Sequence, residues 1–303
     1  MPDLMDYLKP EIISKVDNLE LIAKFIVEGF LIGLHKSPYH GFSVEFSSYR
    51  KYAPGDELKF VDWRVFARTD KFYVKQFEET TNLNCFITMD LSASMNFADV
   101  DRGVGANVTK FAYSSYLAAA LAYMMLQQND SVSLVGFSTD RFEFLPPSGK
   151  SNRLVQFLTV LDKFVPSGET DMGRGLSLLA ERIKGRSLVI ILSDLLVEPR
   201  ELTDALQYFR YKNHEVIIYH ILTNTELTFP FMRQTNFRDI ETGRELVTES
   251  GYIRDDYIAL LEKHTRDIKD ACEEMEVDFV PLSTSDELGG ALMNYLSRRM
   301  MYY

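Results

Sequence analysis

One stretch of the chain, residues 84–95, constrains the fold more than any other. It reads Asn-Cys-Phe-Ile-Thr-Met-Asp-Leu-Ser-Ala-Ser-Met, an apolar run that ends in one carboxylate and two hydroxyls at alternate positions. Continuous short apolar runs are typical of strands that are buried on both faces of a parallel sheet. Asp90, Ser92 and Ser94 are therefore expected at the end of a buried strand. All three offer oxygen, the ligand atom that hard cations such as Mg²⁺ prefer.

From residue 84 onward, short apolar runs alternate with longer helical patterns. We expect strands at 85–89, 132–137, 142–145, 188–192, 216–222 and 277–281. We expect helices at 107–127, 152–164, from 172 onward, and at 198–211, 252–276 and 286–298. This alternation predicts an α/β fold with a doubly wound, mostly parallel six-stranded sheet of the Rossmann type, with the short strand 142–145 antiparallel at its edge.

Two regions of different character are expected along the chain. Residues 1–82 combine an N-terminal helix with a collar that is dense in aromatic and charged residues, and 83–303 form the α/β domain with a small hairpin near 235–248. The apolar segment 19–34 is shorter than the roughly 20 residues that a spanning helix needs. It carries three charges spaced by four residues, so we expect an amphipathic helix on the protein body and no membrane span.

Composition narrows the class of function. The chain has 303 residues and a formal net charge of −11, which argues against general nucleic-acid binding. Cys85 and Cys272 are too isolated to predict a disulfide framework or a zinc site. A reducing cytoplasm is therefore the expected location. The first six residues lack the basic start of a signal peptide, so none is expected.

Two further residues join the candidate site on topological grounds. Asp194 follows the strand 188–192, and Thr170 lies in a loop between the strands 85–89 and 188–192. Ligands of doubly wound sheets bind beyond the carboxyl ends of the strands where the strand order reverses. If strands 85–89 and 188–192 are neighbours, the candidate metal ligands are Asp90, Ser92, Ser94, Thr170 and Asp194. Helix capping is the alternative role for Asp90 and the two serines.

The pattern Asp90-x-Ser92-x-Ser94, with Thr170 and Asp194 later in the chain, resembles the metal-ion-dependent adhesion site of von Willebrand factor A domains. That resemblance implies the strand order three-two-one-four-five-six, with strand three antiparallel. It also implies a divalent cation, Mg²⁺ first and Mn²⁺ or Ca²⁺ as alternatives. One coordination position stays open for a carboxylate from a protein partner. Two carboxylates nearly neutralise the ion, so a third can still be accepted.

The collar resembles the domain-of-unknown-function-58 family. The motifs that carry this resemblance are Tyr49-Arg50-x-Tyr52-x-Pro54-Gly55-Asp56, Asp62-Trp63, Ala67-Arg68-Thr69-Asp70 and Tyr73-Val74-Lys75-x-Phe77-Glu78-Glu79. The family joins such a collar to an A-type domain and is often encoded beside MoxR-type AAA+ ATPases in bacteria. The resemblance therefore implies a non-enzymatic interaction module whose partner is a MoxR-type ATPase or its client. Many relatives have Gly-Gly-Thr where this chain has Gly168-Glu169-Thr170, and an inward Glu169 would weaken capture of an acidic partner.

Two other functions stay open. A metal-dependent hydrolase of the phosphatase kind could use the same ion to activate water, with Glu169 or Asp171 as the nearby base. A structural scaffold could use the metal only to stabilise its fold. The sequence predicts no catalytic residue for the interaction module itself.

Overall fold

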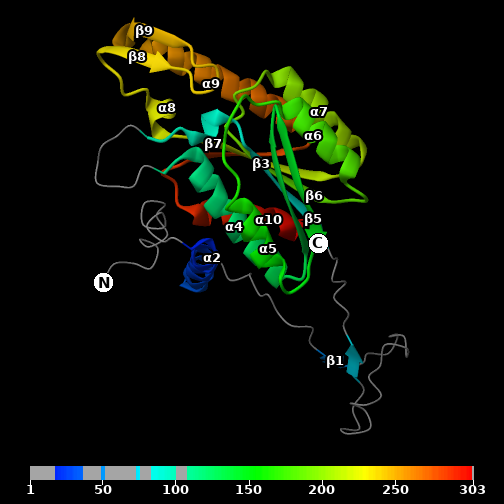
Figure 1. Cartoon of the computed structure of the whole chain (residues 1–303). Helices are drawn as coiled ribbons and strands as arrows, with labels where there is room; N and C mark the ends of the chain where they lie inside the picture. Colours follow the sequence, from blue (N-terminus) through cyan, green and yellow to red (C-terminus); the bar gives the residue numbers. More distant parts are fainter. Residues whose placement is uncertain (1–17, 37–48, 52–72, 76–82, 100–107, 302–303) are drawn as a thin grey trace. The chain divides into compact units, whose positions relative to one another are not determined.

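The computed structural model describes residues 18–36, 49–51, 73–75, 83–99 and 108–301 (Figure 1). The chain forms two compact units, one of residues 1–33 together with 83–303 and one of residues 34–82. In the smaller unit, β1 (Tyr49–Lys51) pairs antiparallel with β2 (Tyr73–Lys75). The collar motifs at 52–56, 62–63, 67–70 and 77–79 lie outside the described residues. The predicted domain boundary at 82/83 stays a prediction.

The larger unit is built on a six-stranded sheet with the order β5-β4-β3-β6-β7-β10. All neighbours in it are parallel except β4 and β5, which are antiparallel at the edge. This is the predicted fold class, and the order three-two-one-four-five-six is confirmed. The strands are β3 (Asn84–Asp90), β4 (Ser131–Ser138), β5 (Arg141–Ser148), β6 (Leu188–Ser193), β7 (Glu215–Leu222) and β10 (Asp278–Ser283).

The two central strands explain why the sheet needs cover on both faces. Residues 85–90 of β3 and every residue of β6 are buried. Ile87 pairs with Leu134 of β4 on one side and with Ile190 of β6 on the other. Side chains of successive strand residues point to opposite faces. A run that is apolar throughout therefore requires a helical layer on each side.

Helices cover the two faces of the sheet (Figure 1). One layer holds α4, α5 and α10, and the other holds α6, α7 and α9. Four alanines of α4 are fully buried and let the helix approach the sheet closely, namely Ala118, Ala119, Ala120 and Ala122. The helices are α4 (Lys110–Gln127), α5 (Arg153–Leu161), α6 (Met172–Arg182), α7 (Pro199–Tyr211), α9 (Ser250–Glu274) and α10 (Leu288–Met301).

The remaining elements are short, apart from the N-terminal helix. A 3₁₀ turn, η3 (Ala93–Asn96), follows β3, and α8 (Asn224–Thr228) follows β7. The predicted hairpin is present as β8 (Gln234–Arg238) and β9 (Glu245–Glu249), paired antiparallel.

Helix α2 (Leu19–Lys36) has the predicted amphipathic character. It buries Ile22 and Ile26, while Lys24 pairs with Glu20 at 3.0 Å on an exposed side. Among the described helices, none combines the length and the apolar character required to traverse a lipid bilayer.

Candidate metal centre

Asp90 is the last residue of β3 and is fully buried at the carboxyl edge of the sheet. Its Oδ1 atom accepts a hydrogen bond from the backbone N–H of Ser92 at 2.9 Å. Its Oδ2 atom accepts one from the Ser193 hydroxyl at 2.8 Å and a longer one from the Thr170 hydroxyl at 3.4 Å. Three separate segments of the chain therefore converge on one carboxylate.

The two serines after Asp90 lie where the chain turns into η3. Ser92 is buried, Ser94 is partly exposed, and their hydroxyl oxygens are 3.0 Å apart. Ser92 precedes the 3₁₀ turn but makes no side-chain capping bond. The capping alternative therefore does not account for the Ser92 hydroxyl, which faces Ser94.

Backbone hydrogen bonds bring Thr170 to the same place. The N–H of Ser167 donates to the carbonyl of Leu91 at 2.8 Å, and the N–H of Ala93 donates to the carbonyl of Gly168 at 2.8 Å. These two bonds tie the loop before α6 to the chain that leaves β3. The predicted meeting of distant segments at this edge is thus achieved by main-chain pairing.

Asp194 follows β6 directly and is also buried. Its Oδ2 atom lies 2.7 Å from the ammonium of Lys110, which lies 2.6 Å from Oε1 of Glu226 as well. Lys110 is fully buried at the start of α4. Burial alone would lower the pKa of Lys110, but the charges of Asp194 and Glu226 outweigh it and raise the pKa. The lysine therefore stays charged and offsets part of the negative charge.

The backbone at Asp194 is held in a specific shape. Leu195 has a φ of 52°, in the left-handed region that side chains with a Cβ seldom adopt. The Nε2–H of His220 donates to the Asp194 carbonyl at 2.9 Å, and the Nε2–H of His264 donates to the Leu195 carbonyl at 2.9 Å. Burial lowers the pKa of His220 to about 4, so this ring is neutral near pH 7. Strained backbone of this kind is concentrated at functional sites.

Two buried carboxylates make the centre electrostatically unfavourable without a cation. Burial raises the pKa of Asp90 to about 6, and the charge of Asp194 adds to the shift. Hydrogen bonds from Ser92 and Ser193 lower the pKa and oppose it only in part. A divalent ion would relieve the cost of ionising Asp90 in this setting.

Glu169 and Asp171, the two candidate bases, take other roles. The Glu169 side chain is exposed, while its backbone carbonyl accepts hydrogen bonds from Thr139. The extra carboxylate in this loop therefore faces solvent. Asp171 caps α6 by accepting a hydrogen bond from the N–H of Arg174 at 2.9 Å.

The donor set suits a hard divalent cation. Its members are hydroxyl and carboxylate oxygens, without nitrogen or sulfur, and Mg²⁺ prefers such ligands together with water. Within the described residues, no three His, Cys, Asp or Glu side chains are grouped as metal ligands. Binding at this edge would therefore depend on the hydroxyls of Ser92, Ser94 and Thr170 as much as on the carboxylates.

Four residues of the centre were not predicted from the sequence. Glu226 could have been found, because Thr223 and Glu226 have the spacing of a capping box, which they form at α8. Ser193 directly precedes the predicted Asp194, and its hydroxyl donates to Asp90. For the other two, Lys110 and Glu241, nothing in the neighbouring sequence indicates a place at the centre. Burial raises the pKa of Glu241, and the polar groups of nearby Ser94 act in the opposite direction.

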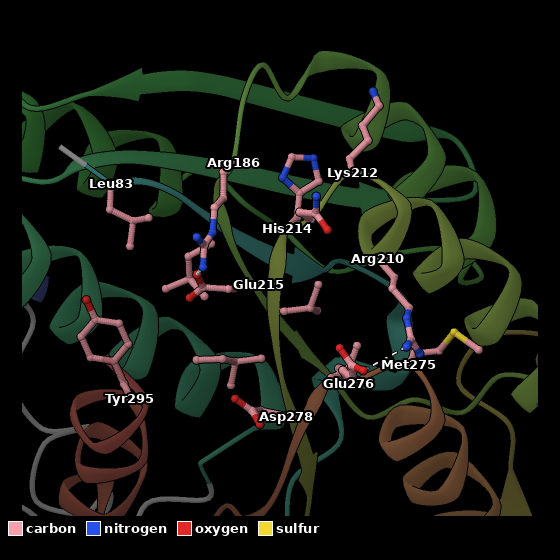
Figure 2. Close-up of a pocket in the computed structure, with 15 residues that line it drawn as sticks. Leu83, Arg186, Arg210, Lys212, His214, Glu215, Met275, Glu276, Asp278 and Tyr295 are labelled. Carbon is pink, nitrogen blue, oxygen red and sulfur yellow. Dashed lines mark hydrogen bonds and ion pairs between the residues drawn. The ribbon is translucent and has the colours of Figure 1, made fainter. Parts of the chain in front are cut away.

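A hollow of about 720 Å³ lies at the opposite edge of the sheet, where β6, β7 and β10 begin (Figure 2). Its charged residues are largely paired with one another. Arg186 contacts Glu215 at 2.7 Å and Arg210 contacts Glu276 at 3.0 Å. Ligands of doubly wound sheets bind at the carboxyl edge instead. The centre around Asp90 is therefore the stronger candidate.

Several known proteins are similar to this chain. Two are the uncharacterized proteins Mb1516 of Mycobacterium bovis and Rv1480 of Mycobacterium tuberculosis. Each is 23% identical over 295 residues, which are 96% of this chain and 90% of the relative.

Solved structures are similar too. BatB from Bacteroides thetaiotaomicron has a TM-score of 0.47 and 18% identity over 71% of this chain and 98% of its own. An aerotolerance-related membrane protein of Bacteroides fragilis has a TM-score of 0.49 and 16% identity over 71% and 99%. The VWA domain of SpRpn10 has a TM-score of 0.42 and 13% identity over 71% and 95%.

The family model described as "Protein of unknown function DUF58" matches residues 48–267, well over half of the chain. The match spans part of the collar and most of the sheet, including every residue of the candidate centre. The chain belongs to the DUF58 family and has a von Willebrand factor A-like fold.

Proposed function

We propose that this protein is a non-enzymatic protein-interaction module that binds a divalent cation, Mg²⁺ first, through Asp90, Ser92, Ser94, Thr170 and Asp194. The observation that supports this most is the convergence on Asp90 of hydrogen-bond donors from three segments, next to a second buried carboxylate. The convergence occurs at the carboxyl edge, between β3 and β6, where connections leave the sheet in opposite directions.

The proposed role of the cation is to take an Asp or Glu carboxylate from a partner. The hydroxyls of Ser92, Ser94 and Thr170 are neutral and add no repulsion against that carboxylate. Lys110 neutralises Asp194 in part, which leaves more of the cation's charge for an incoming group. Glu169 faces solvent and does not add to the negative charge of the centre.

The partner that the family resemblance implies is a MoxR-type AAA+ ATPase or a client that it remodels. In this proposal the module links the ATPase to its client through an acidic residue. The centre lies at one edge of the sheet, beyond the ends of β3 and β6, where a partner residue can approach the partly exposed Ser94.

A hydrolase using the same ion is the second candidate. It needs a base that can reach a bound water. Asp171 is engaged in capping α6 and Glu169 points to solvent, so neither supports that role. Turnover of phosphoester substrates with Mg²⁺ or Mn²⁺ that is lost in Asp171→Ala would favour the hydrolase.

Replacing Asp90 with alanine should lower Mg²⁺ affinity at least tenfold, because removal of a ligand or of the group that orients one commonly costs 10- to 100-fold. Calorimetric titration of Mg²⁺ measures the affinity. Affinity capture from native extract, with Mg²⁺ or with chelator, measures partner recovery, which should need Mg²⁺ and fall in the variant. Asp140→Ala, at an exposed turn, is the matched control and should behave as wild type. Equal Mg²⁺ affinity of wild type and Asp90→Ala would refute the assignment of Asp90 to the cation site.

A further inference from the structure

Exposed apolar side chains are concentrated in one segment of the described chain. Among the described residues, fourteen large apolar side chains are exposed, and seven of them lie between positions 227 and 260. This segment contains α8, the β8–β9 hairpin and the first turns of α9. Gathered apolar residues on a surface indicate an interaction site, whereas isolated ones are ordinary. The hairpin, which lies at the N-terminal end of α9, is therefore a candidate interaction surface (Figure 1).

Aromatic packing holds this hairpin in place. The ring of Phe237 in β8 lies 5.5 Å from that of Phe229 and 5.2 Å from that of Phe231, centroid to centroid. Phe229 also packs against Tyr257 of α9 at 4.5 Å. Ring pairs at such separations are favourable beyond the area that they bury. The two strands are thus ordered before a partner binds, which lowers the entropic cost of binding.

The outer edge of β9 has no neighbouring strand, because β8 and β9 form a two-stranded sheet. The N–H of Asp239 donates to the carbonyl of Arg244 at 2.8 Å, so every second pair from this one onward is hydrogen-bonded within the hairpin. The main-chain groups of Glu245, Val247 and Glu249 consequently point away from β8. Within the part of the chain that the structure describes, no hydrogen-bond partner is found for these groups.

The exposed apolar side chains of the hairpin strands are on β9. Leu246 and Val247 are 60% and 58% exposed and lie on opposite faces of the strand. The one large apolar residue of β8 is Phe237, and its ring is packed against other rings. An exposed apolar edge with unpaired main-chain groups is a template for pairing with another chain. Pairing is therefore expected at β9.

Two glutamates of β9 decide which segment fits this edge. Glu245 and Glu249 are exposed and lie on the same face as Val247. If two copies of β9 paired antiparallel about Val247, Glu245 of each copy would lie directly opposite Glu249 of the other. Like charges in opposite positions destabilise a sheet, whereas a Lys or Arg opposite a Glu stabilises it. The edge therefore disfavours a second copy and favours a segment with two basic residues four positions apart.

We propose that β9 binds an extended segment of a protein partner, which adds a third strand to the hairpin. The main chain of that segment pairs with Glu245, Val247 and Glu249. Its two basic residues lie opposite the glutamates, and apolar residues between them contact Leu246 and Val247. In this mode of recognition the main-chain hydrogen bonds give affinity and alternate side chains give specificity. None of the candidate metal ligands is part of this surface, so the inference does not depend on the cation site.

The test uses the 303-residue chain and the synthetic peptide acetyl-Lys-Thr-Val-Val-Lys-amide as the probe. Chelator is present throughout, so that no cation contributes to binding. Amide NMR spectra of isotope-labelled protein, recorded up to millimolar peptide, should show shifts at Glu245, Val247 and Glu249. The peptide acetyl-Glu-Thr-Val-Val-Glu-amide should bind about tenfold more weakly, because it places carboxylates opposite Glu245 and Glu249. Glu249→Lys should narrow the difference between the two peptides.

Val247→Lys should weaken binding of the lysine peptide about tenfold, since a charge on an edge strand opposes pairing. Val155→Lys is the matched control, because Val155 is 56% exposed on α5, and it should bind as wild type does. The proposal is refuted if wild type shows no shifts at β9, if both peptides bind equally, or if Val247→Lys binds as wild type. Dimerisation of wild type in sedimentation that Val247→Lys abolishes would assign the edge to a second copy and also overturn the proposal.

Discussion

Replacing Lys110 with methionine should lower the free energy of unfolding by about 3–5 kcal/mol, the usual cost of removing one partner from a buried ion pair. Methionine has similar length, so it fills the space that the lysine leaves. It cannot neutralise Asp194 and Glu226, which lie 2.7 and 2.6 Å from the ammonium and would be left buried without compensation. Urea denaturation at pH 7.5 in the presence of chelator measures the loss.

The matched control for this substitution is Lys269→Met. Lys269 is exposed and pairs with Glu273 at 3.5 Å, so its loss should change stability by less than about 0.5 kcal/mol. Mg²⁺ should recover part of the stability of Lys110→Met, because the cation supplies positive charge beside Asp194. A loss below about 1 kcal/mol in chelator would show that the ammonium does not compensate the two carboxylates.

The second large expected effect is an increase in the free energy of unfolding when Asp90 is replaced. Asp90→Asn should stabilise the cation-free protein by about 2 kcal/mol at pH 7.5. The folded protein holds the Asp90 proton more tightly than the unfolded chain, since burial raises the pKa from 3.8 to about 6. Each pKa unit is worth about 1.4 kcal/mol, and poorer hydrogen bonding by the amide offsets part of the gain.

The pH dependence follows from the same shift. Between pH 3.8 and about 6 the folded state binds more protons than the unfolded state, so this carboxyl lowers stability as pH rises through that window. The difference between Asp90→Asn and wild type should therefore grow from pH 4 to pH 6 and then level off. Urea denaturation in chelator across this range measures it, with Asp140→Asn as an exposed control. A variant less stable than wild type at pH 7.5 would contradict the account.

These two substitutions separate stability from binding. Lys110 stabilises the centre without a cation, whereas Asp90 destabilises the cation-free fold. A residue that costs stability when the cation is absent is expected where binding is the function. The scaffold alternative, in which the metal serves only the fold, predicts that chelator alone causes a large loss of stability in wild type and that partner binding does not depend on the ion.

Much of the fold could be predicted because buried parallel strands read as continuous apolar runs. The strand 84–90 ends at the predicted Asp90, and the strand 188–193 is followed directly by the predicted Asp194. The predicted ends of the helices and strands were less accurate. The helix expected from 107 begins at Lys110, capped by the hydroxyl of Thr109, which accepts from the N–H of Ala112. A single threonine does not by itself indicate the residue at which a helix begins.

The missing parts of the centre are those that only tertiary contacts define. A lysine in a sequence normally indicates an exposed residue, and nothing near Lys110 marks its pairing with two distant carboxylates. Glu241 lies in a polar hairpin turn, a place that favours solvent exposure. Its approach to Ser94 depends on how the hairpin is anchored to α9 by Phe229 and Tyr257. Sequence patterns describe the turn but not that anchoring.

The most direct test of the cation site is anomalous diffraction from crystals of the protein soaked in Mn²⁺, recorded at the manganese edge. The account predicts one strong peak at the carboxyl edge of the sheet, among the oxygens of Asp90, Ser92, Ser94 and Thr170, with Asp194 beside it. The peak should disappear in Asp90→Ala crystals. A map with no peak at this edge in the wild-type protein, or with manganese bound only elsewhere, would contradict the account.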